Sequence, residues 1–157
     1  MTNNDVLRNL CETFDFNEDK VVEIFALAEQ KISSKQVSSW LKKANDPELV
    51  ECDNKTLSVF LNGLISEKRG KKEGSLPEPD KIMTNNIVLK KLKIALDLKN
   101  EDVLELLALS GQSVNSYELT SYFRKPGHKN YRPCKNPMLR AFLKAIQLKL
   151  NPTKLEK

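Results

Sequence analysis

The 157-residue sequence contains few of the residues that tight turns, disulfide frameworks and metal sites require. It has five glycines, three cysteines and one histidine, and aromatic residues make up only 6% of it. The cysteines, Cys11, Cys52 and Cys134, are odd in number and widely spaced, which argues against disulfides and against a zinc site. The core must therefore consist mostly of Leu, Ile, Val and Ala. Scarce glycine with abundant Leu and Lys indicates a helical protein.

Long hydrophobic runs are also missing. The longest apolar stretches, such as residues 24–28, are too short to cross a bilayer. The opening MTNND has neither the basic nor the apolar segment of a secretory signal. We therefore expect a cytoplasmic protein that does not contact membranes. The apolar share of 39% is nevertheless high enough for a packed core.

The chain consists of two copies of one unit. The sequence MTNN at residues 1–4 recurs 82 residues later, at 83–86. The same offset, without a gap, aligns further identical or similar residues: Asp15 with Asp97, Trp40 with Tyr122, and Cys52 with Cys134. A polar segment with two Gly and two Pro separates the copies and is typical of a linker. We divide the chain into a first helical repeat (1–67), a polar linker (68–82), a second helical repeat (83–150) and a C-terminal tail (151–157).

Each copy is predicted to hold four helices. In the first copy, apolar residues at helical spacing and capping residues place the helix starts at Asn3 or Asn4, after Asn17, at Ser33 or Ser34, and at Asn54. The pair Asn136-Pro137 marks the matching start of the last helix. No stretch alternates for long enough to predict a strand. The predicted fold is all-α, with two tandem four-helix repeats.

The second and third helices of each copy have the outline of a helix-turn-helix. The second helix of such a motif presents polar side chains to the major groove, and here Lys35, Gln36 and Ser39 would face outward. The turn is longer than usual, and the first copy lacks the glycine that the second has at Gly111. Two antiparallel helices joined by a short turn also pack in this way in ordinary bundles. The pattern fits both interpretations.

Charge is divided unequally between the copies. Residues 1–82 carry 12 Lys and Arg against 15 Asp and Glu, a net charge of −3. Residues 83–157 carry 14 against 6, a net charge of +8. The difference is greatest after the third helix of each copy. There, acids of the first copy are opposed by uncharged or basic residues of the second: Asp46 by His128, Glu48 by Asn130, and Glu51 by Pro133.

This basic segment of the second copy is the candidate functional site. Cations neutralise phosphates and release counterions, and an exposed aromatic ring can stack on a base. The candidate nucleic-acid-binding residues, for DNA or RNA, are Arg124, Lys125, His128, Lys129, Tyr131, Arg132 and Lys135. Two other interpretations fit the same segment: a contact with an acidic protein surface, including a homodimer that pairs an acidic copy with a basic one, or a solvated loop. Tyr131 aligns with Leu49, so it could instead belong to the core.

Nothing in the sequence predicts catalysis. There is no P-loop and no dinucleotide-binding glycine pattern. His128 has no carboxylate nearby in sequence and no second metal ligand at helical spacing. Cys52 and Cys134 occupy equivalent positions in the two copies, which is more easily explained by packing than by a nucleophile. We therefore predict a non-enzymatic protein with no cofactor, no metal and no identified small-molecule substrate. The remaining alternative is an enzyme that uses His128 and a basic anion pocket.

Segments spread over nearly the whole chain carry a family resemblance. They include MTNNDVL at 1–7, VSSWLKK at 37–43, FLNGL at 60–64 and FRKPGHK at 123–129. Through them the chain resembles the YehS-like family of small bacterial proteins, which is built of a duplicated domain of unknown function. The resemblance implies a bacterial cytoplasmic protein with two helical repeats. It implies no catalytic residues.

Overall fold

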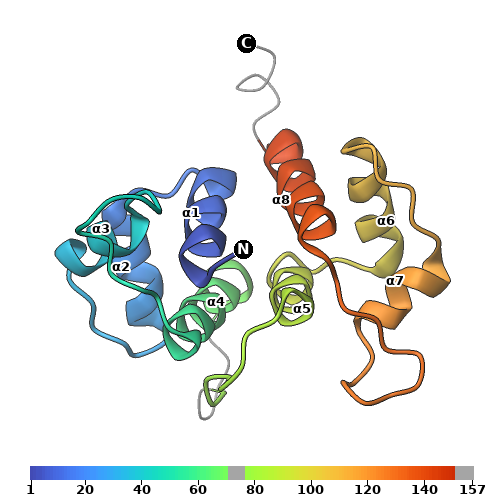
Figure 1. Cartoon of the computed structure of the whole chain (residues 1–157), viewed down its shortest axis with the longest axis horizontal. Helices are drawn as coiled ribbons and strands as arrows, with labels where there is room; N and C mark the ends of the chain where they lie inside the picture. The colour runs from blue at the N-terminus through green and yellow to red at the C-terminus, as the bar shows by residue number, and fades with distance from the viewer. Residues whose placement is uncertain (71–76, 151–157) are drawn as a thin grey trace. The chain divides into compact units, whose positions relative to one another are not determined.

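The computed structural model describes residues 1–70 and 77–150, and these residues form helices and loops without any strand (Figure 1). The helices of the described residues are α1 (Asn3–Phe14), α2 (Glu18–Leu27), α3 (Ser34–Leu41), α4 (Asn54–Arg69), α5 (Asn85–Ala95), α6 (Asn100–Leu109), α7 (Ser116–Tyr122) and α8 (Asn136–Leu150). The second four repeat the first four at the predicted offset. The all-α fold with a duplicated helical domain is confirmed.

Side-chain caps mark the starts of several helices. Thr2 Oγ1 accepts a hydrogen bond from the Asp5 N–H, and the Asp5 carboxylate accepts one from the Thr2 N–H at 3.0 Å, which forms a capping box. Asn17 caps α2 and Asp53 caps α4 with a single side-chain hydrogen bond each, accepted from the backbone N–H three residues later. Helix α1 thus begins at Asn3, and its cap is Thr2 instead of the expected Asn3 or Asn4.

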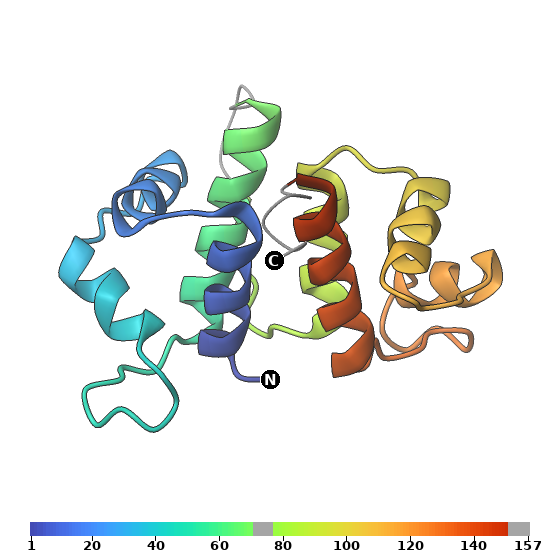
Figure 2. The ribbon, with the colours of Figure 1, turned by 90° about the horizontal axis from the view of Figure 1, so that it is seen from above.

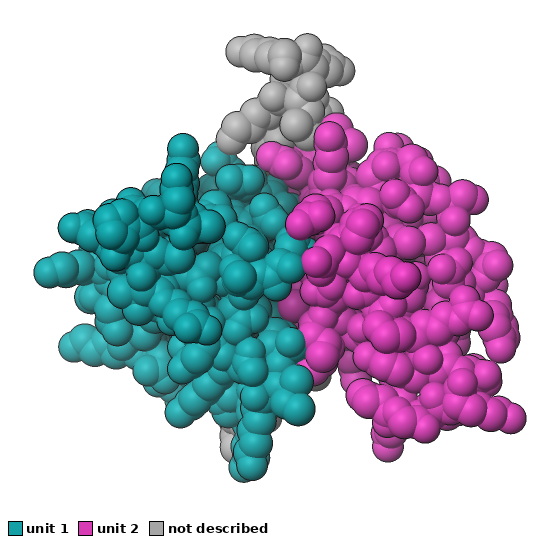
Figure 3. Space-filling model, viewed as in Figure 1, with its two compact units in different colours: residues 1–83 teal, residues 84–157 magenta. Residues whose placement is uncertain are grey.

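The chain divides into two compact units, residues 1–83 and 84–157 (Figure 3). The structure describes the predicted linker, residues 68–82, only in part. Helix α4 continues to Arg69, and residues 71–76, like the predicted tail 151–157, lie outside the described residues. The end of the linker belongs to the first unit, where Ser58 Oγ donates to the Asp80 carboxylate at 2.7 Å and accepts from the Asp80 N–H at 2.8 Å.

In the first unit, α2 and α3 lie together on one side of α1 and α4 (Figures 1 and 2). Phe25 of α2 is at the centre of this core, with its ring centroid 5.5 Å from that of Phe60 and 5.6 Å from that of Trp40. Helices α2 and α4 approach closely at Gly63, where an added Cβ would lie 2.1 Å from the carbonyl oxygen of Ile24. No side chain fits there, so this glycine sets the spacing of the two helices.

The second unit has the same helix arrangement with a different core composition. Tyr122 takes the place of Trp40, and both are buried, at 6% and 7% exposure. The alignment of the two copies predicted this exchange. Ala145, which is fully buried, takes the place of Gly63. The close helix contact of the first unit is therefore not a requirement of the repeat.

The turn between the second and third helices uses the same backbone conformation in both units. Glu29 has φ +59°, and its counterpart Gly111 has φ +83°, so both lie in the left-handed region. The glycine expected from the helix-turn-helix outline is thus present in the second unit. A glutamate adopts the same conformation in the first.

Candidate nucleic-acid interface

The loop that follows α7 is held in place by one buried side-chain amide, that of Asn86 at the start of α5. Asn86 Nδ2 donates to the carbonyl oxygens of Tyr122 at 3.1 Å and of Arg132 at 2.8 Å. Its Oδ1 accepts from the N–H of Cys134 at 2.8 Å. Because Asn86 is only 7% exposed, these bonds form largely away from water. Both ends of the loop are therefore fixed to the same helix.

The preceding residue adds a second attachment. Asn85 Nδ2 donates to the carbonyl oxygen of Cys134 at 2.9 Å and to Asn136 Oδ1 at 2.8 Å, which ties the end of the loop to the start of α8. The first unit contains the same two attachments at the matching positions. Asn4 contacts Trp40, Val50 and Cys52, and Asn3 contacts Cys52 and Asn54.

These contacts give the recurrent MTNN motif a structural role that the sequence analysis did not assign. The motif contains the capping threonine and the two asparagines that hold the loop. The recurrence of the polar residues Thr-Asn-Asn at a helix start in both copies was the available signal. The partners of its asparagines lie 36 to 51 residues away, which no local pattern identifies.

Inside the loop, His128 closes a turn. Its Nδ1 accepts from the N–H of Asn130 at 3.0 Å. In the first unit, Asp46 Oδ1 accepts from the N–H of Glu48 at 2.8 Å at the equivalent place. An imidazole nitrogen thus replaces a carboxylate oxygen as the acceptor, and the negative charge disappears without loss of the turn.

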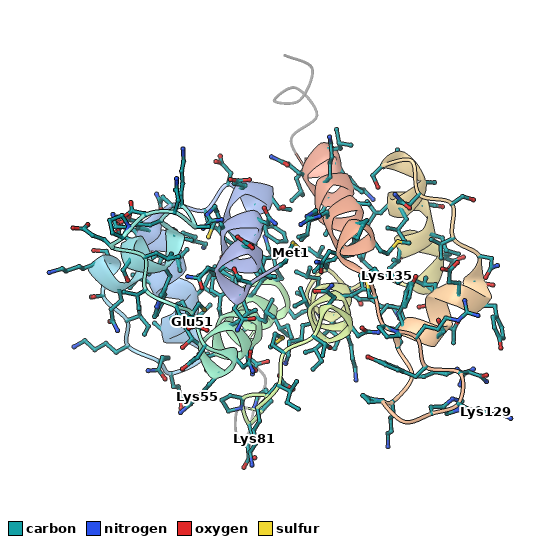
Figure 4. The ribbon with its side chains drawn as sticks, in the orientation of Figure 1. Met1, Glu51, Lys55, Lys81, Lys129 and Lys135 are labelled. Carbon is teal, nitrogen blue, oxygen red and sulfur yellow. The ribbon has the colours of Figure 1, made fainter. Side chains whose placement is uncertain are left out.

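The structure brings the seven candidate residues onto this one loop, between the end of α7 and the start of α8 (Figure 1). Five are exposed: Lys125, His128, Lys129, Arg132 and Lys135. Lys129 lies on the outer turn of the loop, and Lys135 lies near the start of α8 (Figure 4). Arg124 and Tyr131 are half-buried. Tyr131 therefore has the same degree of burial as Leu49, and part of its surface remains accessible.

The cations of this loop have no acidic partner in the described part of the chain. Arg124, Lys125, Lys129, Arg132 and Lys135 form no ion pair there. In the first unit, by contrast, Lys42, the counterpart of Arg124, lies 3.9 Å from the Glu48 carboxylate. The same loop framework thus carries compensated charge in one unit and uncompensated positive charge in the other.

Each unit also has a hollow between the start of its first helix and this loop. In the first unit its volume is about 470 Å³, and in the second about 130 Å³. The hollow of the second unit is lined in part by Lys90 of α5, which the sequence analysis did not select. The alignment of the two copies could have identified Lys90. This lysine is the counterpart of Arg8, and Ile87 stands where the first copy has the acidic neighbour of Arg8, Asp5.

The three thiols are buried, and burial raises the pKa of Cys11 and Cys52 to about 12 and that of Cys134 to about 11. The sulfurs are therefore protonated at neutral pH and poor nucleophiles. Within the described residues, no group of His, Cys, Asp and Glu is arranged to hold a metal ion. No described helix is both long and apolar enough to cross a membrane.

Comparison with known proteins finds a family and no function. The sequence pattern of a family described as a protein of unknown function, DUF1456, matches residues 3–70 and again residues 85–150. An uncharacterized protein, YehS of Escherichia coli (strain K12), is 41% identical over 147 residues, which are 93% of this chain and 94% of that protein. No solved structure matches. The matches confirm the resemblance found in the sequence and the internal duplication.

Proposed function

We propose a non-enzymatic, nucleic-acid-binding function for this chain, which belongs to the DUF1456 family of proteins of unknown function and contains the family's domain twice. The binding surface is the loop of residues 124–135 in the second repeat. The protein would act in the cytoplasm. The observation that carries the proposal is the set of five loop cations without an acidic partner in the described residues. Such cations are free to neutralise phosphates.

The geometry of the loop supports this proposal. Its two ends are attached to Asn86, so its cations are presented on a fixed backbone rather than on a mobile tail. Preorganisation lowers the entropic cost of binding. The half-buried ring of Tyr131 supplies an aromatic face among the cations, where a base can stack.

The helix-turn-helix outline remains a secondary part of the proposal. In the first unit Lys35 and Gln36 are exposed on α3, as a reading helix requires. The Gln36 side chain, however, already accepts from the Ser33 N–H in a capping box, and Ser39 donates to the Gln36 carbonyl. With these groups occupied, the loop of the second repeat is the better-supported surface.

The proposal is tested by fluorescence anisotropy with labelled double-stranded DNA, single-stranded DNA and RNA. The variants are Arg132→Glu, in the loop, and Lys144→Glu, which makes the same change of charge at an exposed position of α8. We expect Arg132→Glu to abolish most of the binding and Lys144→Glu to change it little. If the two variants weaken binding equally, the interaction depends on net charge and the loop has no special role.

A protein-binding function is the second candidate. The equivalent loops of the two repeats carry opposite charge, with Glu48 and Glu51 exposed in the first and Lys129 and Arg132 exposed in the second. Complementary surfaces of this kind can pair two copies of the chain or bind an acidic partner. Sedimentation at low salt and high protein concentration tests the paired form. A monomer under those conditions would exclude the homodimer.

A further inference from the structure

The hollow of the second repeat lies between the start of α5 and the first turn after α7. Its lining includes Lys90, Arg124, Lys125, Tyr131 and the neighbouring Tyr122 and Phe123. Its volume of about 130 Å³ has room for several water molecules and therefore for a tetrahedral oxyanion. The hollow adjoins the basic loop, since Arg124, Lys125 and Tyr131 belong to both.

All charged residues along this hollow are positive. Lys90, Arg124 and Lys125 line it without any carboxylate. In the described part of the chain, none of the three forms an ion pair. Like charges gathered around one concavity repel one another and raise the local concentration of anions. The hollow is therefore suited to a ligand with negative charge.

The first repeat provides an internal comparison, because its equivalent hollow is not cationic. Its charged lining residues are Asp5, Glu51 and Arg8. Arg8 Nη1 lies 3.0 Å from Asp5 Oδ1, and the guanidinium also donates to the carbonyl oxygens of Leu41 and Lys42. The positive charge of Arg8 is thus compensated by Asp5, and its N–H groups already donate to backbone carbonyls. The same fold forms a hollow without an excess of positive charge.

Part of this difference lies on the first helix of each repeat, and part lies in the loop, since Lys42 and Lys43, the counterparts of Arg124 and Lys125, do not line the first hollow. By the offset of 82 residues, Arg8 corresponds to Lys90 and Asp5 corresponds to Ile87. The second repeat therefore keeps the cation on the first helix and replaces its acidic partner with an apolar side chain. Pro133 likewise stands where Glu51 supplies the second acid. Of these two positions, only Ile87 lines the hollow of the second repeat.

We infer that the hollow of the second repeat binds a phosphate group, through Lys90, Arg124 and Lys125. The ring of Tyr131 borders the same space and can contact the base or sugar attached to that phosphate. The inference rests on the proposed function, in which the phosphate belongs to the nucleic acid bound by the loop. Inorganic phosphate presents the same chemistry, so the test separates the two sources.

The test uses the full chain labelled with 15N and follows its amide NMR signals during titration with inorganic phosphate at constant ionic strength. In the wild type, we expect saturable shifts for the amide signals of residues around the hollow: Ile87, Lys90, Arg124 and Lys125. The signals of their counterparts in the first repeat should not shift. The key variant is Ile87→Asp, which restores the arrangement of Asp5 and Arg8. It should weaken phosphate binding at least about tenfold, because an adjacent carboxylate then compensates Lys90.

The Ile87→Asp variant is expected to fold. The Thr84 side chain already accepts from the N–H of residue 87, and an aspartate there completes the capping box that Thr2 and Asp5 form in the first repeat. Lys144→Gln, which changes the net charge by the same amount on α8, is the control and should bind phosphate like the wild type. Absent shifts, equal shifts in both repeats, or unchanged binding by Ile87→Asp would overturn the inference.

A second titration with single-stranded and duplex oligonucleotides identifies the source of the phosphate. Oligonucleotides that shift the same amide signals, and bind Ile87→Asp more weakly, support the hollow as part of the nucleic-acid site. If oligonucleotides bind the wild type and Ile87→Asp equally, the proposed function stands, but the hollow is not the place where the nucleic-acid phosphate binds. Phosphate binding without any oligonucleotide binding would keep the hollow and reject the proposed function.

Discussion

The side-chain oxygen of Asn86 accepts a hydrogen bond of 2.8 Å from the backbone N–H of Cys134, 48 residues later in the chain. This contact attaches the end of the basic loop to the start of α5. The same side chain binds the carbonyl oxygens of Tyr122 and Arg132, so one amide determines where the loop leaves α7 and where it returns. The loop can therefore differ in charge between the repeats while its attachment stays the same.

Replacing this amide should destabilise the second repeat. Asn86→Ala removes three hydrogen bonds, two of them buried, and leaves backbone groups without partners, so we expect the free energy of unfolding to fall by about 2–4 kcal/mol. Urea unfolding measures the change. Asn130→Ala, in the same loop, is the control, because the recorded hydrogen bond of Asn130 uses its backbone N–H and survives the substitution. Equal stability of both variants would contradict the role of Asn86.

The two units should respond in different ways to substitution at the equivalent positions 63 and 145. Gly63→Ala places a methyl group 2.1 Å from the Ile24 carbonyl oxygen, and α2 and α4 must separate to admit it. We expect a loss of about 2–4 kcal/mol, although Gly→Ala in a helix normally stabilises by up to about 1 kcal/mol. Ala145→Gly should cost only about 1–2 kcal/mol through helix propensity and lost burial. Thermal unfolding distinguishes these outcomes, and a stabilised Gly63→Ala variant would disprove the close contact.

Much of the fold could be predicted from the sequence, because the features that determine it are local. Capping residues and apolar spacing indicate the starts of α2, α3 and α8. The gapless offset transfers each assignment from one copy to the other. It also predicts that Tyr122 fills the position of Trp40, since both are large aromatic residues at one position of the repeat.

The candidate site was predicted only in part. Its seven residues lie within twelve positions of the sequence, so the local composition of that segment identifies them, and in the structure they belong to one loop. The place of Lys90 beside the loop could not be found by composition, because this residue is separated from the loop by more than 30 positions and is brought near it by the fold. The close contact at Gly63 also depends on the separation of two helix backbones, which the sequence does not encode locally.

The buried thiols should make stability depend on pH in the alkaline range. Cys52 and Cys134 have pKa values raised by burial to about 12 and about 11, from an ordinary value of 9.0. Above pH 9 the unfolded chain loses thiol protons that the folded chain retains, so the free energy of unfolding falls as the pH rises toward 11. Well below pH 9 both states keep their thiol protons, and the thiols contribute no pH dependence.

Urea unfolding between pH 8 and pH 10.5 measures this effect. The fall in stability should be smaller in Cys134→Ala than in the wild type, because one of the shifted groups is missing. An aromatic disulfide reagent at pH 8 should react slowly with the folded protein and rapidly after unfolding. Fast reaction of the native protein would show that the thiols are accessible.

The turn at His128 predicts a particular tautomer of its ring. Because Nδ1 accepts from the N–H of Asn130, the neutral imidazole carries its proton on Nε2. Long-range 1H–15N NMR spectra of the neutral protein distinguish the two nitrogens. His128→Asp should preserve the turn, as Asp46 does in the first repeat, yet weaken nucleic-acid binding severalfold by adding a negative charge to the loop. A neutral ring protonated at Nδ1 would contradict this assignment.

The most direct test of the nucleic-acid account is an exchange of the two loops, measured by anisotropy over a range of salt concentrations. Because Asn4 and Asn86 hold their loops by the same hydrogen bonds, residues 42–53 and 124–135 can replace each other without a change in length. A chain with two first-repeat loops should fold and lose binding, and a chain with two basic loops should bind more tightly, with a steeper dependence on salt. Binding that is unchanged when the basic loop is removed would contradict the account.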